Sequence, residues 1–207
     1  MRLAIFGATG GTGLALTQLA LEHGHSVRVL VRNPSRMPLV NANMRLVLGN
    51  VLDQESVMKT VLGSDAVLSC LGSRNLLKNV RVVSEGTRRI ISVMKQQGVR
   101  RLVVESAFGA GESLAQTRLI ERLVFATLLW APYQDKELME PEVKSSDLEW
   151  TILRPVRLTN GPPTNRYVVS TSRPPRTSVS RADVGAAMLQ AVEERLWIAE
   201  APSVCSG

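Results

Sequence analysis

The sequence predicts an α/β fold, in which a doubly wound parallel sheet carries helices on both faces. Two observations predict it. The chain starts with an apolar run, Leu3 to Phe6, followed by a glycine-rich turn and then by helical spacing from Leu14 to Leu21. Apolar runs and helical segments then alternate, as they do when right-handed crossovers join parallel strands. We therefore expect a ligand crevice at the carboxyl ends of the strands.

The later elements follow the same alternation. Six further runs have the length and bulk of strands: Val27–Val31, Arg45–Gly49, Ala66–Leu71, Arg101–Glu105, Trp150–Arg154 and Tyr167–Ser170. Helical spacing continues over Gln54–Leu62, Val80–Gln97, Glu112–Ala131, Asp135–Ser146 and Arg181–Glu194. No segment between them has the composition of a linker, so residues 1–207 are predicted to form a single-domain Rossmann fold.

Composition restricts the function classes. Hydrophobic residues make up 44% of the chain and charged residues 21%, as in globular proteins, and no apolar run approaches a membrane span. Cys70 and Cys205 lack metal-ligand spacing, and we expect no metal site, a cytoplasmic location and a monomer. The histidines, His23 and His25, are expected to be exposed. The net charge of +7 suits an anionic ligand, and nucleic-acid binding is a minor hypothesis because no recognition pattern occurs.

The glycine turn is the strongest functional signal. Gly7, Gly10 and Gly13 lie between the first strand and the first helix, in the spacing G-x-x-G-x-x-G. Such a turn points main-chain N–H groups outward, and the helix start behind it adds partial positive charge. The sequence therefore predicts a diphosphate-binding turn of a dinucleotide fold.

The end of the second strand indicates which dinucleotide binds. An acidic residue there would accept hydrogen bonds from the ribose of NAD. This chain has Arg32, followed by Ser35 and Arg36. Guanidinium groups with a hydroxyl suit a 2′-phosphate. We therefore predict NADP(H), with a preference for NADPH over NADH.

Several stretches resemble a known family. They are Ile5–Gly13, Val29–Arg32, Leu71–Asn75, Ser84–Gly86, Glu105–Phe108, Trp150–Pro155 and Val179–Val184. Together they resemble the NAD(P)H-binding, NmrA-like proteins of the atypical short-chain dehydrogenase/reductase family, flavin and biliverdin reductases above all. The resemblance spans almost the whole chain.

The resemblance implies a set of cofactor-binding residues. It assigns the diphosphate to Gly7, Thr9, Gly10, Gly11, Thr12 and Gly13, and the adenine to Asn50 and Val51. It assigns the path to the nicotinamide to Leu71, Gly72, Arg74 and Ser106, and the carboxamide end to Pro155, Val156, Arg157 and Leu158. Asn50 replaces a common aspartate of the family, and Arg157 replaces a histidine, so the substrate side of the pocket is expected to differ.

The sequence predicts a reduction that does not use a tyrosine as the proton donor. Carbonyl-reducing relatives use Tyr-x-x-x-Lys, whereas Tyr133 and Lys136 are three positions apart. We expect Ser106 and Lys136 to be the catalytic candidates, with Ser106 orienting groups rather than attacking. Planar flavin-, quinone- or biliverdin-like acceptors, which delocalise the incoming electrons, suit such a site. We expect the acceptor loops at 72–79, 108–116 and 157–166. The alternative is a non-catalytic NADP(H) sensor of NmrA type.

Overall fold

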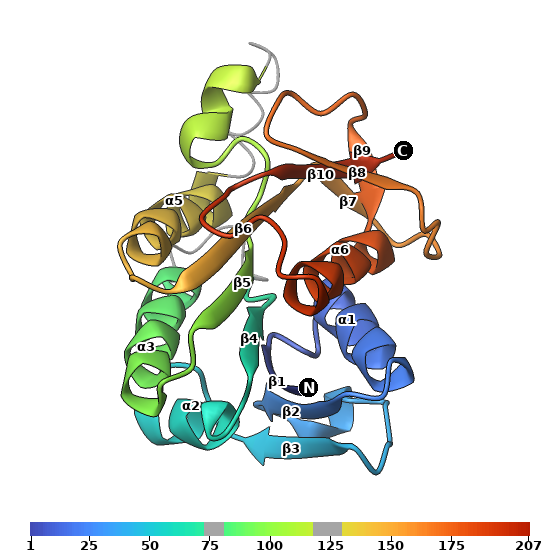
Figure 1. Cartoon of the computed structure of the whole chain (residues 1–207). Helices are drawn as coiled ribbons and strands as arrows, with labels where there is room; N and C mark the ends of the chain where they lie inside the picture. The colour runs from blue at the N-terminus through green and yellow to red at the C-terminus, as the bar shows by residue number, and fades with distance from the viewer. Residues whose placement is uncertain (73–80, 118–129) are drawn as a thin grey trace.

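The computed structural model describes residues 1–72, 81–117 and 130–207, and its centre is a sheet of eight strands (Figure 1). The strand order is β3-β2-β1-β4-β5-β6-β10-β8. Neighbouring strands are parallel, except that β10 and β8 are antiparallel. The strands are β1 (Arg2–Phe6), β2 (Ser26–Val31), β3 (Met44–Leu48), β4 (Ala66–Ser69), β5 (Arg101–Glu105), β6 (Glu149–Pro155), β8 (Tyr167–Ser170) and β10 (Ser203–Ser206).

Helices cover both faces of the sheet (Figure 1). One face carries α1 (Gly11–Glu22) and α6 (Arg181–Glu193), and the other carries α2 (Gln54–Val61), α3 (Val82–Gln97) and α5 (Trp130–Lys144). Each face has its own apolar cluster, because successive strand residues point to opposite sides. In β1, Leu3 and Ile5 pack towards α1 and α6, whereas Ala4 and Phe6 pack towards the other helices. The predicted α/β fold with helices on both faces is confirmed.

The topology fixes where a ligand can bind. The first six strands follow the order 3-2-1-4-5-6, so the chain winds in opposite directions from β1 and β4. The loops that leave these two strands therefore diverge at their carboxyl ends. A crevice forms at this switch point, between the turn after β1 and the segment after β4.

The elements that the sequence did not predict are short. They are β7 (Arg157–Thr159) and β9 (Ser178–Ser180), which form a separate parallel pair, and β10. Three or four residues are too few to show a period-two pattern, and β10 is half serine. The antiparallel direction of β8 depends on its pairing with β10, so it could not be predicted either.

The segment 112–131 differs from its prediction as a helix. Its first residues form a 3₁₀ helix, η2 (Gly111–Gln116), and residues 118–129 lie outside the described part of the chain. Helix α5 starts at Trp130, earlier than predicted, which places Pro132 in its first turn, where a missing N–H costs little. Pro141 lies inside α5 and does not end it.

Two arginines are buried and hold elements together. Arg154 on β6 donates to the carboxylates of Glu112 and Glu140, so this arginine belongs to the interior rather than to the binding edge. Arg101 donates to three carbonyl oxygens, among them those of Ala191 and Leu196 at 2.7 and 2.9 Å, and burial lowers its pKa to about 10. Both therefore act as structural cross-links between strands and helices.

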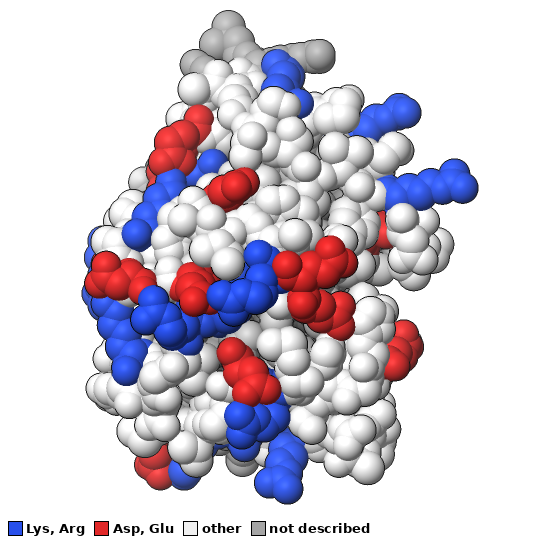
Figure 2. Space-filling view, in the orientation of Figure 1, with Lys and Arg blue, Asp and Glu red and all other residues white. Residues whose placement is uncertain are grey.

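The surface shows charges of both signs. On the face in Figure 2, Lys and Arg side chains are interspersed with Asp and Glu. A basic stripe of one sign, as nucleic-acid binding requires, is not visible on this face. Among the described helices none combines the length and apolarity that a membrane span would need.

Candidate functional site

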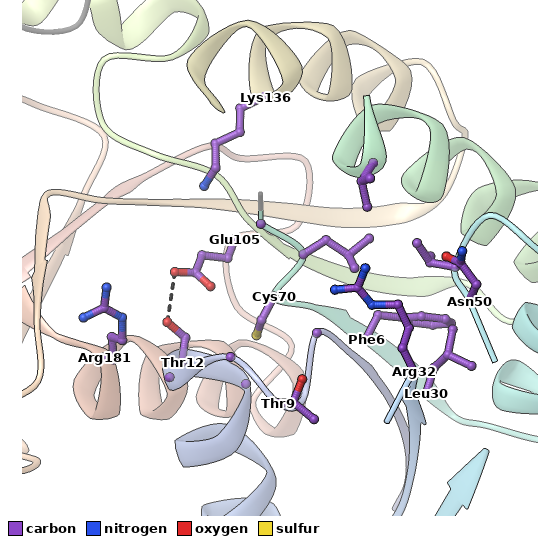
Figure 3. Close-up of a pocket in the computed structure, with 18 of the residues that line it drawn as sticks. Phe6, Thr9, Thr12, Leu30, Arg32, Asn50, Cys70, Glu105, Lys136 and Arg181 are labelled. Carbon is purple, nitrogen blue, oxygen red and sulfur yellow. Dashed lines mark hydrogen bonds between the residues drawn. The ribbon is translucent and has the colours of Figure 1, made fainter. Parts of the chain in front are cut away.

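A cavity of about 390 Å³ opens at the switch point, at the carboxyl ends of the central strands (Figure 3). Most of the predicted site residues line it: Gly7, Thr9, Gly10, Gly11, Thr12, Gly13, Arg32, Asn50, Val51, Leu71, Gly72, Lys136 and Leu158. It is also lined by residues that the sequence did not single out as site residues: Phe6, Leu30, Gly49, Cys70, Val82, Glu105 and Arg181. The cavity thus brings together residues from nine separate segments of the chain.

The floor of the cavity is the turn between β1 and α1. Gly7 has a positive φ of 75°, and a β-carbon there would overlap the carbonyl group of Cys70 at the end of β4. A β-carbon on Gly13 would overlap the carbonyl of Gly7. The amide of Gly10 closes the turn by donating to that same carbonyl at 2.9 Å. Only glycine lets these backbone segments approach so closely, which leaves space above the turn for an anion.

The start of α1 is electrostatically prepared for a phosphate. Its N-cap, Gly10, supplies no side chain to the first N–H groups, and no acidic residue lies in the first turn. The side chain of Arg181, the first residue of α6, lies over Gly11 and donates to Asn160 at 2.6 Å. The helix terminus and the guanidinium therefore place positive charge on the same side of the cavity.

The second and third strands form the other end of the cavity. Arg32 directly follows β2 and lines the cavity, while Asn50 and Val51 follow β3. Ser35 and Arg36 lie in the 3₁₀ helix η1 (Pro34–Arg36) and do not line it. The Ser35 hydroxyl instead donates to the side chain of Asn33 at 2.8 Å. Of the three residues predicted to bind the 2′-phosphate, Arg32 therefore lines the cavity, and Ser35 and Arg36 lie outside it.

Glu105 and Lys136 face the cavity from opposite elements, the end of β5 and helix α5 (Figure 3). The Thr12 hydroxyl donates to Glu105 at 3.1 Å, and the Lys136 amine donates to the carbonyl of Ser106 at 2.5 Å. Burial raises the pKa of Glu105, and the charge of Lys136 opposes that rise. Burial lowers the pKa of Lys136, and the charge of Glu105 opposes that fall. The cavity thus contains an acid and a base whose affinities for a proton are brought closer together.

The Ser106 side chain points to the face of the sheet that carries α5, whereas the Glu105 side chain points to Thr12 of α1. The Ser106 hydroxyl donates to Glu140 of α5 at 2.7 Å, and Ser106 does not line the cavity. The reason is the strand alternation: Glu105 points to one face and its neighbour to the other. Glu105 is one of the lining residues that the sequence did not single out, and counting the alternation along β5 would have pointed to it.

Tyr133 is not placed as a proton donor to the cavity. Its hydroxyl donates to the carbonyl of Phe108 at 2.8 Å, and burial raises its pKa. Lys136 lines the cavity and Tyr133 does not. The spacing of three in α5 therefore leaves the phenol and the amine with different partners.

The remaining predicted residues, 155–158, lie at the end of β6 and the start of β7. Leu158 lines the cavity, whereas Pro155, Val156 and Arg157 do not. The backbones of Pro155 and Val156 bind neighbouring segments, through Phe108 at 2.9 Å and Val204 at 3.1 Å. Arg74, and the loop 72–79 beyond Gly72, lie outside the described residues.

Comparison with known proteins gives the family. A family model described as NAD(P)H-binding matches residues 7–195. An uncharacterized chloroplastic protein of Arabidopsis thaliana is 26% identical over 81% of this chain and 63% of its own length. A 3-diazoavenalumate denitrifying reductase of Streptomyces is 34% identical over 53% of this chain and 39% of its own length. The chain therefore spans less than two thirds of these curated relatives.

A third relative and two solved structures match over more of their length. The uncharacterized sugar epimerase YhfK of Bacillus subtilis is 27% identical over 94% of this chain and 89% of its own. ChuY, an anaerobillin reductase from Escherichia coli O157:H7, matches with a TM-score of 0.84 and 20% identity, over 100% of this chain and 97% of its own. A short-chain dehydrogenase/reductase from Veillonella parvula, solved in complex with NADP, matches with a TM-score of 0.84 and 19% identity. The match covers 99% of this chain and 94% of that one. These structures support the fold.

Proposed function

The chain belongs to the NAD(P)H-binding family, and from this premise we propose that it is a reductase that uses NADPH to reduce a planar acceptor. The acceptor class is a flavin, a quinone or a biliverdin-like tetrapyrrole. The observation that carries the proposal is the coincidence, in one cavity, of the glycine turn after β1 and Arg32 after β2. The turn suits a diphosphate, and the arginine suits an additional phosphate on the ribose.

Different residues of the cavity would bind different parts of NADPH. The N–H groups at the start of α1, together with Arg181, would hold the diphosphate. Arg32 would hold the 2′-phosphate, since its guanidinium can donate two parallel hydrogen bonds to it. Asn50 and Val51 would contact the adenine, and Leu71, Gly72 and Leu158 would line the way to the nicotinamide. Ser35 and Arg36 would assist if η1 approached the phosphate on binding.

The reaction needs a hydride and a proton. The cofactor, when bound, supplies the hydride. The chain's own contribution is to orient the two rings and to hold a proton near them. Lys136 and Glu105 are the described groups that line the cavity and have shifted pKa values suited to this task, with Cys70 raised well above its usual range by burial. We assign Lys136 as the proton source and Glu105 as the carboxylate that sustains its charge.

The acceptor class is inferred from the position of the Tyr133 hydroxyl, which does not line the cavity. A ketone reduced by hydride becomes an alkoxide and needs a close proton donor, but the Tyr133 hydroxyl is bound to a backbone carbonyl. Flavins, quinones and extended tetrapyrroles spread the added electrons over their rings, so proton transfer can be slower and less directed. The reductase names of the Streptomyces relative and of ChuY support reduction as the reaction class. We place the acceptor against the loops 108–116 and 157–166, and against 72–79.

The experiment is a turnover assay with one acceptor of each class. NADPH oxidation would be followed at 340 nm with FMN, a naphthoquinone and biliverdin, each with and without the protein. We expect saturable turnover with at least one acceptor, and a lower KM for NADPH than for NADH. Turnover of a simple ketone, with none of the planar acceptors, would contradict the assignment of the acceptor class.

A non-catalytic NADP(H) sensor is the second candidate. The engagement of Tyr133 favours it, because a protein that only binds the cofactor has no use for a placed phenol. The same assay separates the two functions. Tight NADPH binding without turnover of any acceptor would support the sensor and contradict the reductase.

We further propose that residues 1–207 act as one domain, as a monomer, in the cytoplasm. The two faces of one continuous sheet support the first statement, since each carries its own apolar cluster. Sedimentation velocity of the full chain tests the second, with a single species of the mass of one chain as the expected result.

A further inference from the structure

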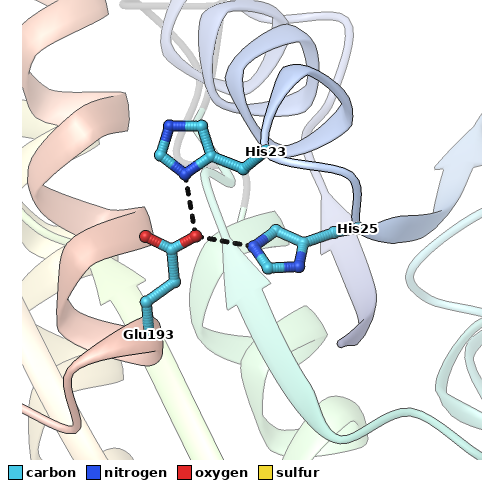
Figure 4. Close-up of side chains that lie close together, drawn as sticks. All are labelled: His23, His25 and Glu193. Carbon is cyan, nitrogen blue, oxygen red and sulfur yellow. Dashed lines mark hydrogen bonds and ion pairs between the residues drawn. The ribbon is translucent and has the colours of Figure 1, made fainter.

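Both histidines of the chain lie against one carboxylate, far along the helices from the cavity (Figure 4). The sequence predicted that both would be exposed and that no metal-ligating group of residues would form. Instead, His25 is buried, and only His23 is exposed. Both rings point towards the side chain of Glu193, at the last residue of α6.

The contacts are made by one nitrogen of each ring. His23 Nδ1 lies 2.9 Å from Glu193 Oε1, and His25 Nε2 lies 2.7 Å from the same oxygen. The other nitrogen of His25 already has a partner, the amino group of Met1 at 3.0 Å. The three potential ligand atoms lie within 4.8 Å of one another. The three atoms are therefore close enough to share one cation, which would displace the ring protons that make these hydrogen bonds.

The fold builds this convergence from two helices that run in the same direction. Helices α1 and α6 pack against each other, and both begin at the cavity, with Gly11 under the Arg181 side chain. Both helices also end together: His23 is the C-cap of α1, and Glu193 closes α6. The carbonyl ends of helices carry partial negative charge, so two of them meet here. That electrostatic setting favours a cation.

We propose that His23, His25 and Glu193 bind one divalent transition-metal ion, of which Zn²⁺ is the representative. Two imidazoles and a carboxylate are a ligand set that Zn²⁺ accepts, with water in the fourth position. Tetrahedral bonds of roughly 2.0–2.1 Å separate the ligand atoms by roughly 3.4 Å. Each nitrogen–oxygen contact therefore opens by about half an ångström. His23 and Glu193, which are both exposed, can make this adjustment by side-chain rotation.

The proposed ion would join the ends of α1 and α6. Binding to the folded chain alone would raise its stability by mass action. The site lies one length of α1 away from the glycine turn, about 18 Å for its 12 residues at 1.5 Å each. Zn²⁺ binding and NADPH binding are therefore separate properties, and the failure of one leaves the other standing.

The first test measures Zn²⁺ binding to the full chain without a histidine tag, by titration calorimetry and by thermal unfolding. We expect one site per chain and, at about 100 times the dissociation constant, a Tm rise of about 5–10 °C that EDTA reverses. Mg²⁺ should give no shift, because nitrogen ligands suit it poorly. His23→Ala and Glu193→Gln should each lower the Zn²⁺ affinity by at least roughly 10–100-fold. That is the loss expected when a residue that only supports a metal ligand is removed, and these residues are ligands themselves.

The matched control is Glu194→Gln, which changes the neighbouring carboxylate, a partner of Gln190 at 3.1 Å. It should bind Zn²⁺ as the wild type does. Weak, multiple binding in the wild type, or unchanged affinity in both His23→Ala and Glu193→Gln, would overturn the proposal.

The second test covers His25, whose burial makes its substitution a test of folding as well. Two histidines give only two ring systems in a long-range ¹H–¹⁵N spectrum of the imidazoles. Zn²⁺ should shift the Nδ1 signal of His23 and the Nε2 signal of His25 at one equivalent. A spectrum unchanged by Zn²⁺ would show that the three side chains form a hydrogen-bonded cluster alone.

Discussion

At the scale of single residues, the chemistry of the cavity depends on two buried groups of opposite charge. Lys136 has a pKa lowered by burial, and Glu105 opposes that shift. If Lys136 supplies the proton, turnover should fall as the pH rises through its lowered pKa, below the usual range for lysine. Removing the carboxylate should lower that pKa further. The alkaline limb of the pH profile is therefore the signature of this pair.

The first prediction concerns that limb. Glu105→Gln should move the alkaline fall of kcat to lower pH, and Lys136→Gln should remove the limb together with most of the activity. The measurement is kcat at saturating NADPH between pH 6 and 10. Glu142→Gln is the control, since that carboxylate lies on the same helix but pairs with Arg88 at the surface. An identical limb in the wild type and in Glu105→Gln would exclude this role for the pair.

The second prediction concerns cofactor choice. Arg32→Ala should weaken NADPH binding about 10- to 100-fold, the value of one or two charge-assisted hydrogen bonds of about 1.5–3 kcal/mol. Binding of NADH, which lacks the 2′-phosphate, should change far less. Fluorescence titration with both cofactors gives the comparison, and NADH is the internal control. Arg36→Ala should have a smaller effect, because Arg36 does not line the cavity. Equal losses for both cofactors would exclude a 2′-phosphate contact.

The third prediction compares two glycines with the same backbone conformation. Gly7 and Gly24 have φ of 75° and 77°, but a β-carbon would meet the Cys70 carbonyl at Gly7 and nothing within 4 Å at Gly24. Gly24→Ala should cost about 1–2 kcal/mol of unfolding free energy, from backbone strain. Gly7→Ala should cost about 2–5 kcal/mol, because overpacking adds to the strain. Urea unfolding measures both, and equal costs would contradict the close approach.

At the scale of secondary-structure elements, Asp183 connects helix α6 to the predicted acceptor loop. Its buried carboxylate accepts hydrogen bonds from the backbone amides of Thr164 and Asn165 at 2.8 and 3.0 Å. It also accepts from the hydroxyls of Thr164 and of Ser180, the N-cap of α6. One side chain thus fixes the start of α6 and the end of the loop 157–166.

The fourth prediction follows from these contacts. Asp183→Ala should lower the unfolding free energy by about 2–4 kcal/mol, because one buried and three part-buried donors lose a charged acceptor. Asp183→Asn keeps one acceptor oxygen and should lose less. Urea unfolding gives the stabilities, and the KM for the acceptor should rise in Asp183→Ala more than the KM for NADPH. A stable Asp183→Ala with an unchanged KM would show that the loop does not depend on this residue.

The sequence predicted those elements whose patterns are local. The long apolar runs became the central strands, and Gly98 ends α3 in the left-handed conformation that glycine favours. What it could not predict depends on partners far along the chain. The buried position of Arg154 requires Glu112 and Glu140, and the cluster of His23 and His25 requires Glu193, which is 168 positions from His25. In the site, the glycine turn predicted from a local pattern lines the cavity, and so does Glu105, whose position depends on which face of β5 turns towards it.

At the scale of the whole molecule, the cavity lies between segments of both halves of the chain, so binding there should stabilise the fold as a unit. The fifth prediction is that NADPH at about 100 times its dissociation constant raises the Tm by about 5–10 °C. NADH at the same concentration should give a smaller rise. At that NADPH concentration the shift should shrink to about 1–5 °C in Arg32→Ala, because its affinity is about 10- to 100-fold lower. A rise that is equal for both cofactors in the wild type would contradict the preference for NADPH.

The position of β10 in the sheet also affects how the chain folds during its synthesis on the ribosome. β8 joins the rest of the sheet through β10, whose residues are made more than thirty positions later. At synthesis rates of about 5–20 residues per second, β8 waits for seconds with an unpaired edge. During that interval, β6 also exposes the edge that β10 later covers. Nascent chains of this length are therefore the stage at which chaperone contact would matter most.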